Sequence, residues 1–183
     1  RQIEGESPMQ ELKDRIVKEG KVLPGNIIKV DGFLNHRIDT ELMDHIAEEF
    51  GKHFNMDEVT MILTAEASGI ALSAIVARLC GAGLLVLFSD IDGLYDADPR
   101  THPDARLIHQ VEAITPELRA MAGGAGTWRG TGGMATKLNA AQLCLEAGVD
   151  MVIANGARME ALYDIVEGKN VGTRFSARRG ALQ

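Results

Sequence analysis

Residues 59–89 read VTMILTAEASGIALSAIVARLCGAGLLVLFS, and this stretch decides the fold class. Its first part, residues 59–65, is rich in β-branched and apolar side chains and predicts a strand. An apolar helix is expected over residues 70–80. It begins after Ser68-Gly69 and ends before Gly81 and Gly83. Residues 84–89 form a continuous apolar run, which is typical of a parallel strand buried on both faces. The stretch therefore predicts one complete βαβ unit.

Strand and helix patterns alternate on both sides of this unit. We expect helices over residues 8–20, 39–54, 115–121, 134–146 and 159–166, and extended segments over 26–30, 151–154 and 173–176. In the second helix Asp39 is the expected N-cap, and Leu42, Ile46, Phe50 and Phe54 form an apolar stripe. This alternation predicts an α/β fold, a three-layer sandwich with a mainly parallel sheet, as a single domain over residues 9–183. Residues 1–8 are polar and precede Met9, so we treat them as a leader outside the fold.

Composition narrows the classes of function. Nineteen Lys and Arg against 26 Asp and Glu give a net charge of −7 and a pI near 5.2. That charge disfavours nucleic acid as a partner, because an acidic surface repels its phosphate backbone. The apolar runs are only as long as a strand, so we expect no membrane span. Cys80 and Cys144 lie among apolar residues and predict reduced core thiols of a cytoplasmic protein.

Glycines and a lysine form the strongest candidate site, GTGGMATK at residues 130–137. Glycines allow backbone N–H groups to turn inward, and the N-terminus of the following helix adds a partial positive charge, which suits a phosphate. Lys137 in the first turns opposes the helix dipole at a cost of about 0.3–1 kcal/mol, which an anion would remove. The alternative is a linker before a surface helix. The motif is not a Walker loop, because Lys137 follows the last glycine by four residues.

A second candidate, SDIDGLYDADP at residues 89–99, follows the buried strand. Open α/β sheets bind ligands at such carboxyl ends. The aspartate spacing does not match a calcium loop, so a turn that shapes a nucleotide pocket is favoured over a metal site. The histidines show no metal-ligand spacing, and we expect no metal site; they are His36, His45, His53, His102 and His109.

Residues 72–176 resemble the carboxyl-terminal half of the kinase domain of the glutamate 5-kinase family, which are amino acid kinases of proline biosynthesis. The resemblance rests on LSAIVARLCGAGLLVLFSDIDGLYDADPRTHPDARLI, AGGAGTWRGTGGMATKLNAA and GVDMVIANG. It implies ATP with Mg as ligand, and Lys137 as the catalytic residue nearest the transferred phosphoryl group. The nucleotide-binding residues that it implies are Ser89, Asp90, Thr131, Gly132, Gly133, Met134, Ala135, Thr136 and Lys137.

Residues 9–70 resemble xanthine phosphoribosyltransferase instead, on VLPGNIIKVDGFLNHRID and TMILTAEASGIA. This second resemblance implies a purine site lined by Ile28 and Asn35. The two resemblances meet near residues 68–72, inside the βαβ unit, which predicts a hybrid chain. Both families form dimers, so a homodimer is one expected state, although interface segments of both are missing from the hybrid.

In this hybrid interpretation, the site of each of the two families is incomplete. The kinase-like part has no amino-terminal glycine-rich phosphate loop, and EASGIA replaces the acidic substrate segment before LSA. The transferase-like part lacks the adjacent acidic residues that would bind the ribose of phosphoribosyl pyrophosphate. We therefore favour a weak nucleotide or phosphate binder without full catalysis. The alternatives are an active ATP-dependent glutamate kinase and a purine-salvage phosphoribosyltransferase.

Overall fold

The computed structural model describes residues 8–30, 32–34, 39–66, 69–122 and 133–177. The chain divides into two compact units, residues 1–56 and 57–183, and each is described by itself. The boundary between the units does not coincide with the junction near residues 68–72 that the hybrid interpretation predicts. Of the expected leader, residues 1–7 lie outside the described ranges, and Pro8 already begins a helix. Within the described ranges, every helix is too short or too polar to cross a membrane.

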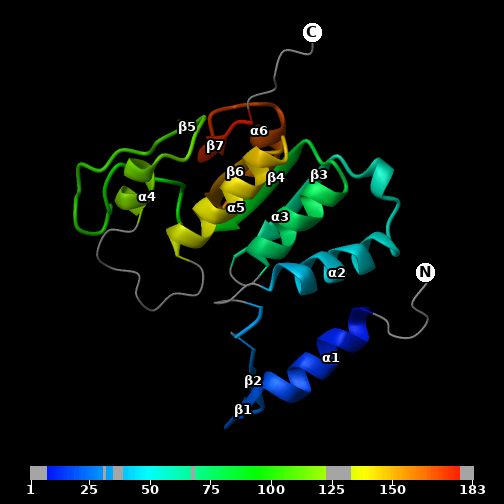
Figure 1. Cartoon of the computed structure of the whole chain (residues 1–183). Helices are drawn as coiled ribbons and strands as arrows, with labels where there is room; N and C mark the ends of the chain where they lie inside the picture. Colours follow the sequence, from blue (N-terminus) through cyan, green and yellow to red (C-terminus); the bar gives the residue numbers. More distant parts are fainter. Residues whose placement is uncertain (1–7, 31, 35–38, 67–68, 123–132, 178–183) are drawn as a thin grey trace. The chain divides into compact units, whose positions relative to one another are not determined.

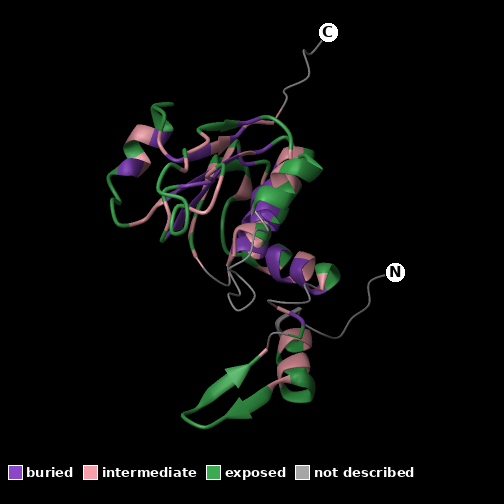
Figure 2. Ribbon diagram, turned by 90° about the vertical axis from the view of Figure 1, so that its left-hand side faces the viewer, coloured by how far each residue is buried: buried purple, intermediate pink, exposed green. Residues whose placement is uncertain are grey.

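The first unit contains helix α1 (Pro8–Glu19), a hairpin of β1 (Lys21–Leu23) and β2 (Ile27–Lys29), and helix α2 (Thr40–Gly51). Gly25 and Asn26 form the hairpin turn with positive φ angles of 87° and 59°. Both residue types tolerate this region of backbone conformation. All six strand residues of the hairpin are exposed, as Figure 2 shows.

Helix α2 confirms the predicted cap and part of the predicted apolar stripe. The Asp39 carboxylate accepts a hydrogen bond from the Leu42 backbone N–H at 3.2 Å. Leu42 and Ile46 are buried, together with Met43 and Ala47. The stripe does not continue, because Phe50 is 44% exposed and Phe54, at 61% exposed, lies beyond the end of the helix.

The second unit holds a five-stranded sheet in the order β3-β4-β6-β7-β5 (Figure 1). Its strands are β3 (Met61–Ala65), β4 (Leu84–Ser89), β5 (Gln110–Val111), β6 (Asp150–Asn155) and β7 (Thr173–Phe175). Strands β3, β4 and β6 are mutually parallel, β5 is parallel to β7, and β7 is antiparallel to β6. The expectation of a mainly parallel sheet is therefore confirmed, and β5 is an additional short strand.

Helices cover both faces of this sheet, as the alternation of side chains along the central strands requires. Leu85 and Leu87 of β4 face α3 (Ile70–Leu79) and α5 (Met134–Glu146), which pack side by side. Val86 and Phe88 face α6 (Ala161–Val166) on the other side. A further short helix, α4 (Pro116–Ala122), contacts α5. The three-layer arrangement predicted from the strand and helix alternation is thus present in this unit.

The βαβ unit that decided the fold class is formed as predicted. Strands β3 and β4 are parallel neighbours, with Met61 opposite Leu84. Helix α3 between them buries Ile70, Ala74 and Ala77, each at most 1% exposed. Both cysteines are free thiols: Cys144 is buried, which raises its pKa to about 12, and Cys80 is half-buried.

Candidate functional site

The carboxyl ends of three neighbouring strands bring polar side chains to one edge of the sheet. Glu66 follows the last residue of β3, Ser89 ends β4, and Asn155 ends β6, directly opposite Ser89. The Glu66 backbone N–H donates to the Phe88 carbonyl at 2.8 Å, which extends the parallel ladder by one residue. Ligands bind at this edge in open α/β sheets, so the three side chains mark a candidate ligand site.

Lys137 reaches this edge from helix α5. Its ammonium nitrogen Nζ donates to Glu66 Oε1 at 2.8 Å, and its side chain is only 3% exposed. Helical side chains tilt toward the helix N-terminus, which is why a lysine in the first turn reaches the strand ends rather than the solvent beside the helix. A buried ammonium costs free energy unless it is paired, and the Glu66 carboxylate supplies the charge.

Ser89 connects the ion pair to the following aspartate. Its hydroxyl Oγ makes hydrogen bonds with Glu66 Oε2 and with Asp90 Oδ1, the latter at 3.1 Å. Ser89 is itself buried, at 6% exposed. Ser89, Asp90 and Lys137, which the sequence marked as site residues, therefore lie in one hydrogen-bonded cluster with Glu66. We call these four residues the strand-edge cluster.

The start of helix α5 adds backbone donors near this cluster. Gly133 is the N-cap residue and has no side chain that could accept a hydrogen bond from the first turn. The first N–H groups of a helix have no partner within the helix, so those of Met134 and Ala135 are suited to an external anion. Thr136 N–H bonds back to the Gly133 carbonyl at 2.9 Å. Thr131 and Gly132, the other predicted loop residues, lie outside the described residues.

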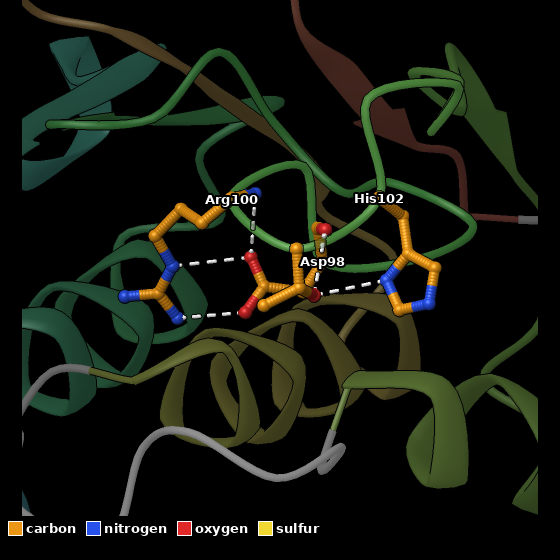
Figure 3. A network of polar contacts seen from close by, with 4 residues as sticks. Asp98, Arg100 and His102 are labelled. Atoms are coloured by element: carbon orange, nitrogen blue, oxygen red, sulfur yellow. Dashed lines mark hydrogen bonds and ion pairs between the residues drawn. The ribbon is translucent and has the colours of Figure 1, made fainter.

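Two of the aspartates after β4, Asp96 and Asp98, form hydrogen bonds within the loop that carries them. Asp96 accepts a hydrogen bond from the Arg106 backbone at 2.7 Å. Figure 3 shows Arg100 facing the Asp98 carboxylate, with Nη2 at 2.9 Å from Oδ2, and this contact holds the pKa of Asp98 below its usual value. The His102 backbone N–H donates to the Asp98 carbonyl at 2.8 Å. These aspartates organise the turn, and among the described residues no group of three or more His, Cys, Asp or Glu side chains is arranged to hold a metal ion.

A small pocket lies beside the strand-edge cluster, where Asp92 and Asn155 meet. Asn155 Nδ2 donates to Asp92 Oδ1 at 2.8 Å, and the Tyr95 hydroxyl donates to Asp92 Oδ2 at 3.0 Å. Burial and this bond to Asp92 raise the pKa of Tyr95. The pocket has a volume of about 110 Å³ and is lined by Asp92, Asn155, Arg158, Ala161, Val171 and Gly172. Asp92 is the residue of the 89–99 turn that lines this pocket.

Sequence reasoning missed Glu66, which lies in the EASGIA segment interpreted only as a departure from a family motif. The available signal was its position directly after a predicted strand, the same criterion that selected Ser89 and Asp90. The two residues predicted to line a purine site, Ile28 and Asn35, belong to the first unit of the chain. Ile28 is 54% exposed in the hairpin of the first unit, and Asn35 lies outside the described residues.

Comparison with known proteins shows which proteins part of this chain resembles. Residues 71–155 match the model of the amino acid kinase family. The matching relatives include the glutamate 5-kinase of Clostridium perfringens, 48% identical over 69% of this chain and 46% of that protein. The glutamate 5-kinase of Clostridium tetani is 58% identical over 58% of this chain and 40% of that protein. The middle and carboxyl-terminal part of the chain therefore resembles glutamate 5-kinase.

These similarities cover only part of this chain and only part of each relative. The chain spans less than half the length of the two clostridial relatives. A uridylate kinase structure from Archaeoglobus fulgidus matches 61% of this chain and 47% of that chain, with 20% identity and a TM-score of 0.45. The relatives named here lend no support to the phosphoribosyltransferase resemblance of residues 9–70 or to a hybrid chain.

Proposed function

We propose that residues 57–183 bind the phosphate groups of a nucleotide, ATP with Mg, at the strand-edge cluster. The observation that carries the proposal is the buried ammonium of Lys137 in the first turn of α5, 3% exposed and held at the ends of β3 and β4. A cation at a helix N-terminus opposes the helix dipole, and in this structure the Glu66 carboxylate is the negative group that balances Lys137. A phosphate there would accept hydrogen bonds from both the ammonium and the backbone, which makes it a suitable ligand.

The names of the matching relatives support a nucleotide rather than another anion. They are glutamate 5-kinases, and a kinase transfers a phosphoryl group from a nucleotide to an acceptor, here glutamate. Phosphoryl transfer requires mainly positioning and charge neutralisation from the protein. We limit the proposal to nucleotide binding, because this chain spans less than half the length of those two relatives.

Each residue of the cluster then has a role toward the ligand. Lys137 and the N–H groups at the start of α5 would neutralise and orient the phosphate oxygens, and Ser89 would donate to one of them. Asp90 would repel a bare phosphate, but its carboxylate suits the Mg²⁺ ion that accompanies ATP. Bound Mg²⁺ lowers the charge that the protein must neutralise. The pocket at Asp92 and Asn155 lies on the same edge and is available to the rest of the nucleotide.

Titration calorimetry with ATP and Mg at fixed salt tests the proposal. Lys137→Met should weaken binding by about 1–3 kcal/mol, as expected for a lost hydrogen bond to a charged group. Lys169→Met is the matched control, because Lys169 forms exposed ion pairs with Asp164 and Glu167, away from the strand-edge cluster. Adenosine, which lacks phosphates, should bind far more weakly than ATP. Equal ATP affinity in wild type and Lys137→Met, or no ATP binding by the folded wild type, would overturn the proposal.

A further inference from the structure

We infer that Glu66 sets the anion affinity of this site by competing with the incoming phosphate for Lys137. The inference rests on the proposed function and deepens it, because it assigns a role to a residue that the nucleotide-site motifs do not include. In the described state the Glu66 carboxylate occupies the position of a bound anion: it accepts from Lys137 Nζ at 2.8 Å and is hydrogen-bonded to Ser89 Oγ.

The local charges make these two anions mutually exclusive. Glu66 and Asp90 place two carboxylates around Ser89, against the single ammonium of Lys137 and the partial positive charge of the α5 N-terminus. The Lys137 side chain is 3% exposed and that of Glu66 is 19% exposed, so water screens their interaction poorly. A phosphate that approached Lys137 with Glu66 in place would meet a like charge at hydrogen-bond distance, which is strongly unfavourable.

Rotation of one side chain would resolve this conflict. The Glu66 backbone is fixed by its N–H bond to the Phe88 carbonyl at 2.8 Å, so β3 keeps its register while the side chain moves. The carboxylate is partly exposed and can turn toward solvent. Its departure would release one hydrogen-bond donor on Lys137 and would remove one of the two carboxylates, Glu66 and Asp90, that share the Ser89 hydroxyl proton. The donor on Lys137 would then face the phosphate, so the same movement that removes the competing charge completes the site.

A purely structural role for Glu66 predicts a different outcome. If Glu66 only makes a buried lysine tolerable, replacing it should loosen Lys137 and weaken phosphate binding. If Glu66 competes, removing its charge should strengthen phosphate binding even where the fold becomes less stable. Glu66→Gln separates the two roles, because glutamine keeps the shape and an acceptor oxygen for Lys137 but carries no charge.

Calorimetric titration of Glu66→Gln with ATP plus Mg, and separately with inorganic tripolyphosphate, tests the inference. We expect both ligands to bind at least about tenfold more tightly than to wild type. Glu66→Asp, which keeps the charge, should stay near wild type. Glu146→Gln should also stay near wild type, because it removes one charge from an exposed position near the far end of α5.

Each outcome decides whether Glu66 competes with the phosphate for Lys137. Unchanged or weaker binding by Glu66→Gln, with wild-type binding that depends on Lys137, would overturn the inference and leave the proposed function standing. No binding by either protein would overturn both. If Glu66→Gln does not fold, the ¹³Cδ resonance of Glu66 in wild type serves instead. It should shift when ATP and Mg are added, and a resonance that stays fixed while ATP binds would overturn the inference.

Discussion

Lys137 Nζ and Glu66 Oε1 lie 2.8 Å apart although 71 positions separate the two residues in the sequence. This ion pair joins the first turn of α5 to the end of β3. Because the Lys137 side chain is almost fully buried, the pair is a stability element of the second unit as well as part of the site.

Removal of the Lys137 charge should therefore destabilise the fold. We expect Lys137→Met to lower the free energy of unfolding by about 1–3 kcal/mol, less than for a fully buried pair because Glu66 is partly exposed. A double-mutant cycle with Glu66→Gln, followed by urea unfolding, measures the coupling. The Lys169–Asp164 pair, at 2.7 Å but with Lys169 58% exposed, should give a much smaller coupling, because water screens an exposed ion pair. Equal coupling in the two pairs would contradict this prediction.

Thr173 ties three segments of the second unit together. Its hydroxyl accepts from the Leu94 backbone N–H at 2.8 Å and donates to the Ile108 carbonyl at 2.6 Å, and the residue is fully buried. Thr173→Val keeps the shape but leaves both backbone groups without this partner, which should cost about 1–3 kcal/mol in unfolding free energy. Thr173→Ser keeps the hydroxyl and should cost clearly less. Chemical denaturation of the two variants makes the comparison, and a valine variant as stable as the serine variant would refute it.

Gly172 has a conformation and a location that exclude a side chain. Its φ is +65°, and a Cβ atom there would lie 2.0 Å from the Ile153 carbonyl oxygen. Gly168 has a similar φ of +78° but open space around the Cβ position. Gly168→Ala should cost about 1–2 kcal/mol for backbone strain alone. Gly172→Ala should cost about 1–3 kcal/mol more, because β6 must shift to relieve the clash. Thermal unfolding of both variants gives the difference, and similar melting temperatures would contradict the packing described here.

The contact between α1 and α2 should depend on pH. Glu11 Oε2 lies 2.8 Å from His45 Nδ1, and this hydrogen bond raises the pKa of His45, with smaller contributions from Glu48 and Glu41. A raised pKa means that folding favours the charged imidazole. The stabilisation is therefore complete below the ordinary histidine value of about 6.5 and is lost as the pH rises through the higher folded value.

NMR titration of the His45 ring protons tests this pH dependence. Glu11→Gln should lower the pKa of His45 toward its ordinary value. Glu19→Gln is the control on the same helix, because Glu19 pairs with Arg15 and not with His45. A His45 titration that is unaffected by Glu11→Gln would show that the contact is not formed in solution.

Sequence pattern predicted the second unit well where elements are long and buried. The continuous apolar run of β4 and the glycine-bounded helix α3 carry strong local signals, and both elements form close to their predicted bounds. The hairpin strand β1 and the strand β5 were missed, because three exposed residues or two residues alone show no hydrophobic alternation.

The candidate site was only partly predictable for a related reason. Ser89, Asp90 and Lys137 could be chosen because each follows a local rule about strand ends or helix starts. The partner of Lys137 could not be chosen in this way, because a contact across 71 positions depends on how β3 and α5 pack in three dimensions. Glu66 therefore emerged only from the structure.

Backbone NMR of the wild-type protein, titrated with ATP and Mg, tests the central claim most directly. We predict that the largest ¹H–¹⁵N shift changes occur at Ser89, at Asp90 and at residues 133–137, and that the hairpin around Ile28 changes little. Lys137→Met should reduce these changes at the same ATP concentration. Changes that are largest in the hairpin, or that persist unaltered in Lys137→Met, would contradict the assignment of a nucleotide phosphate site to the strand-edge cluster.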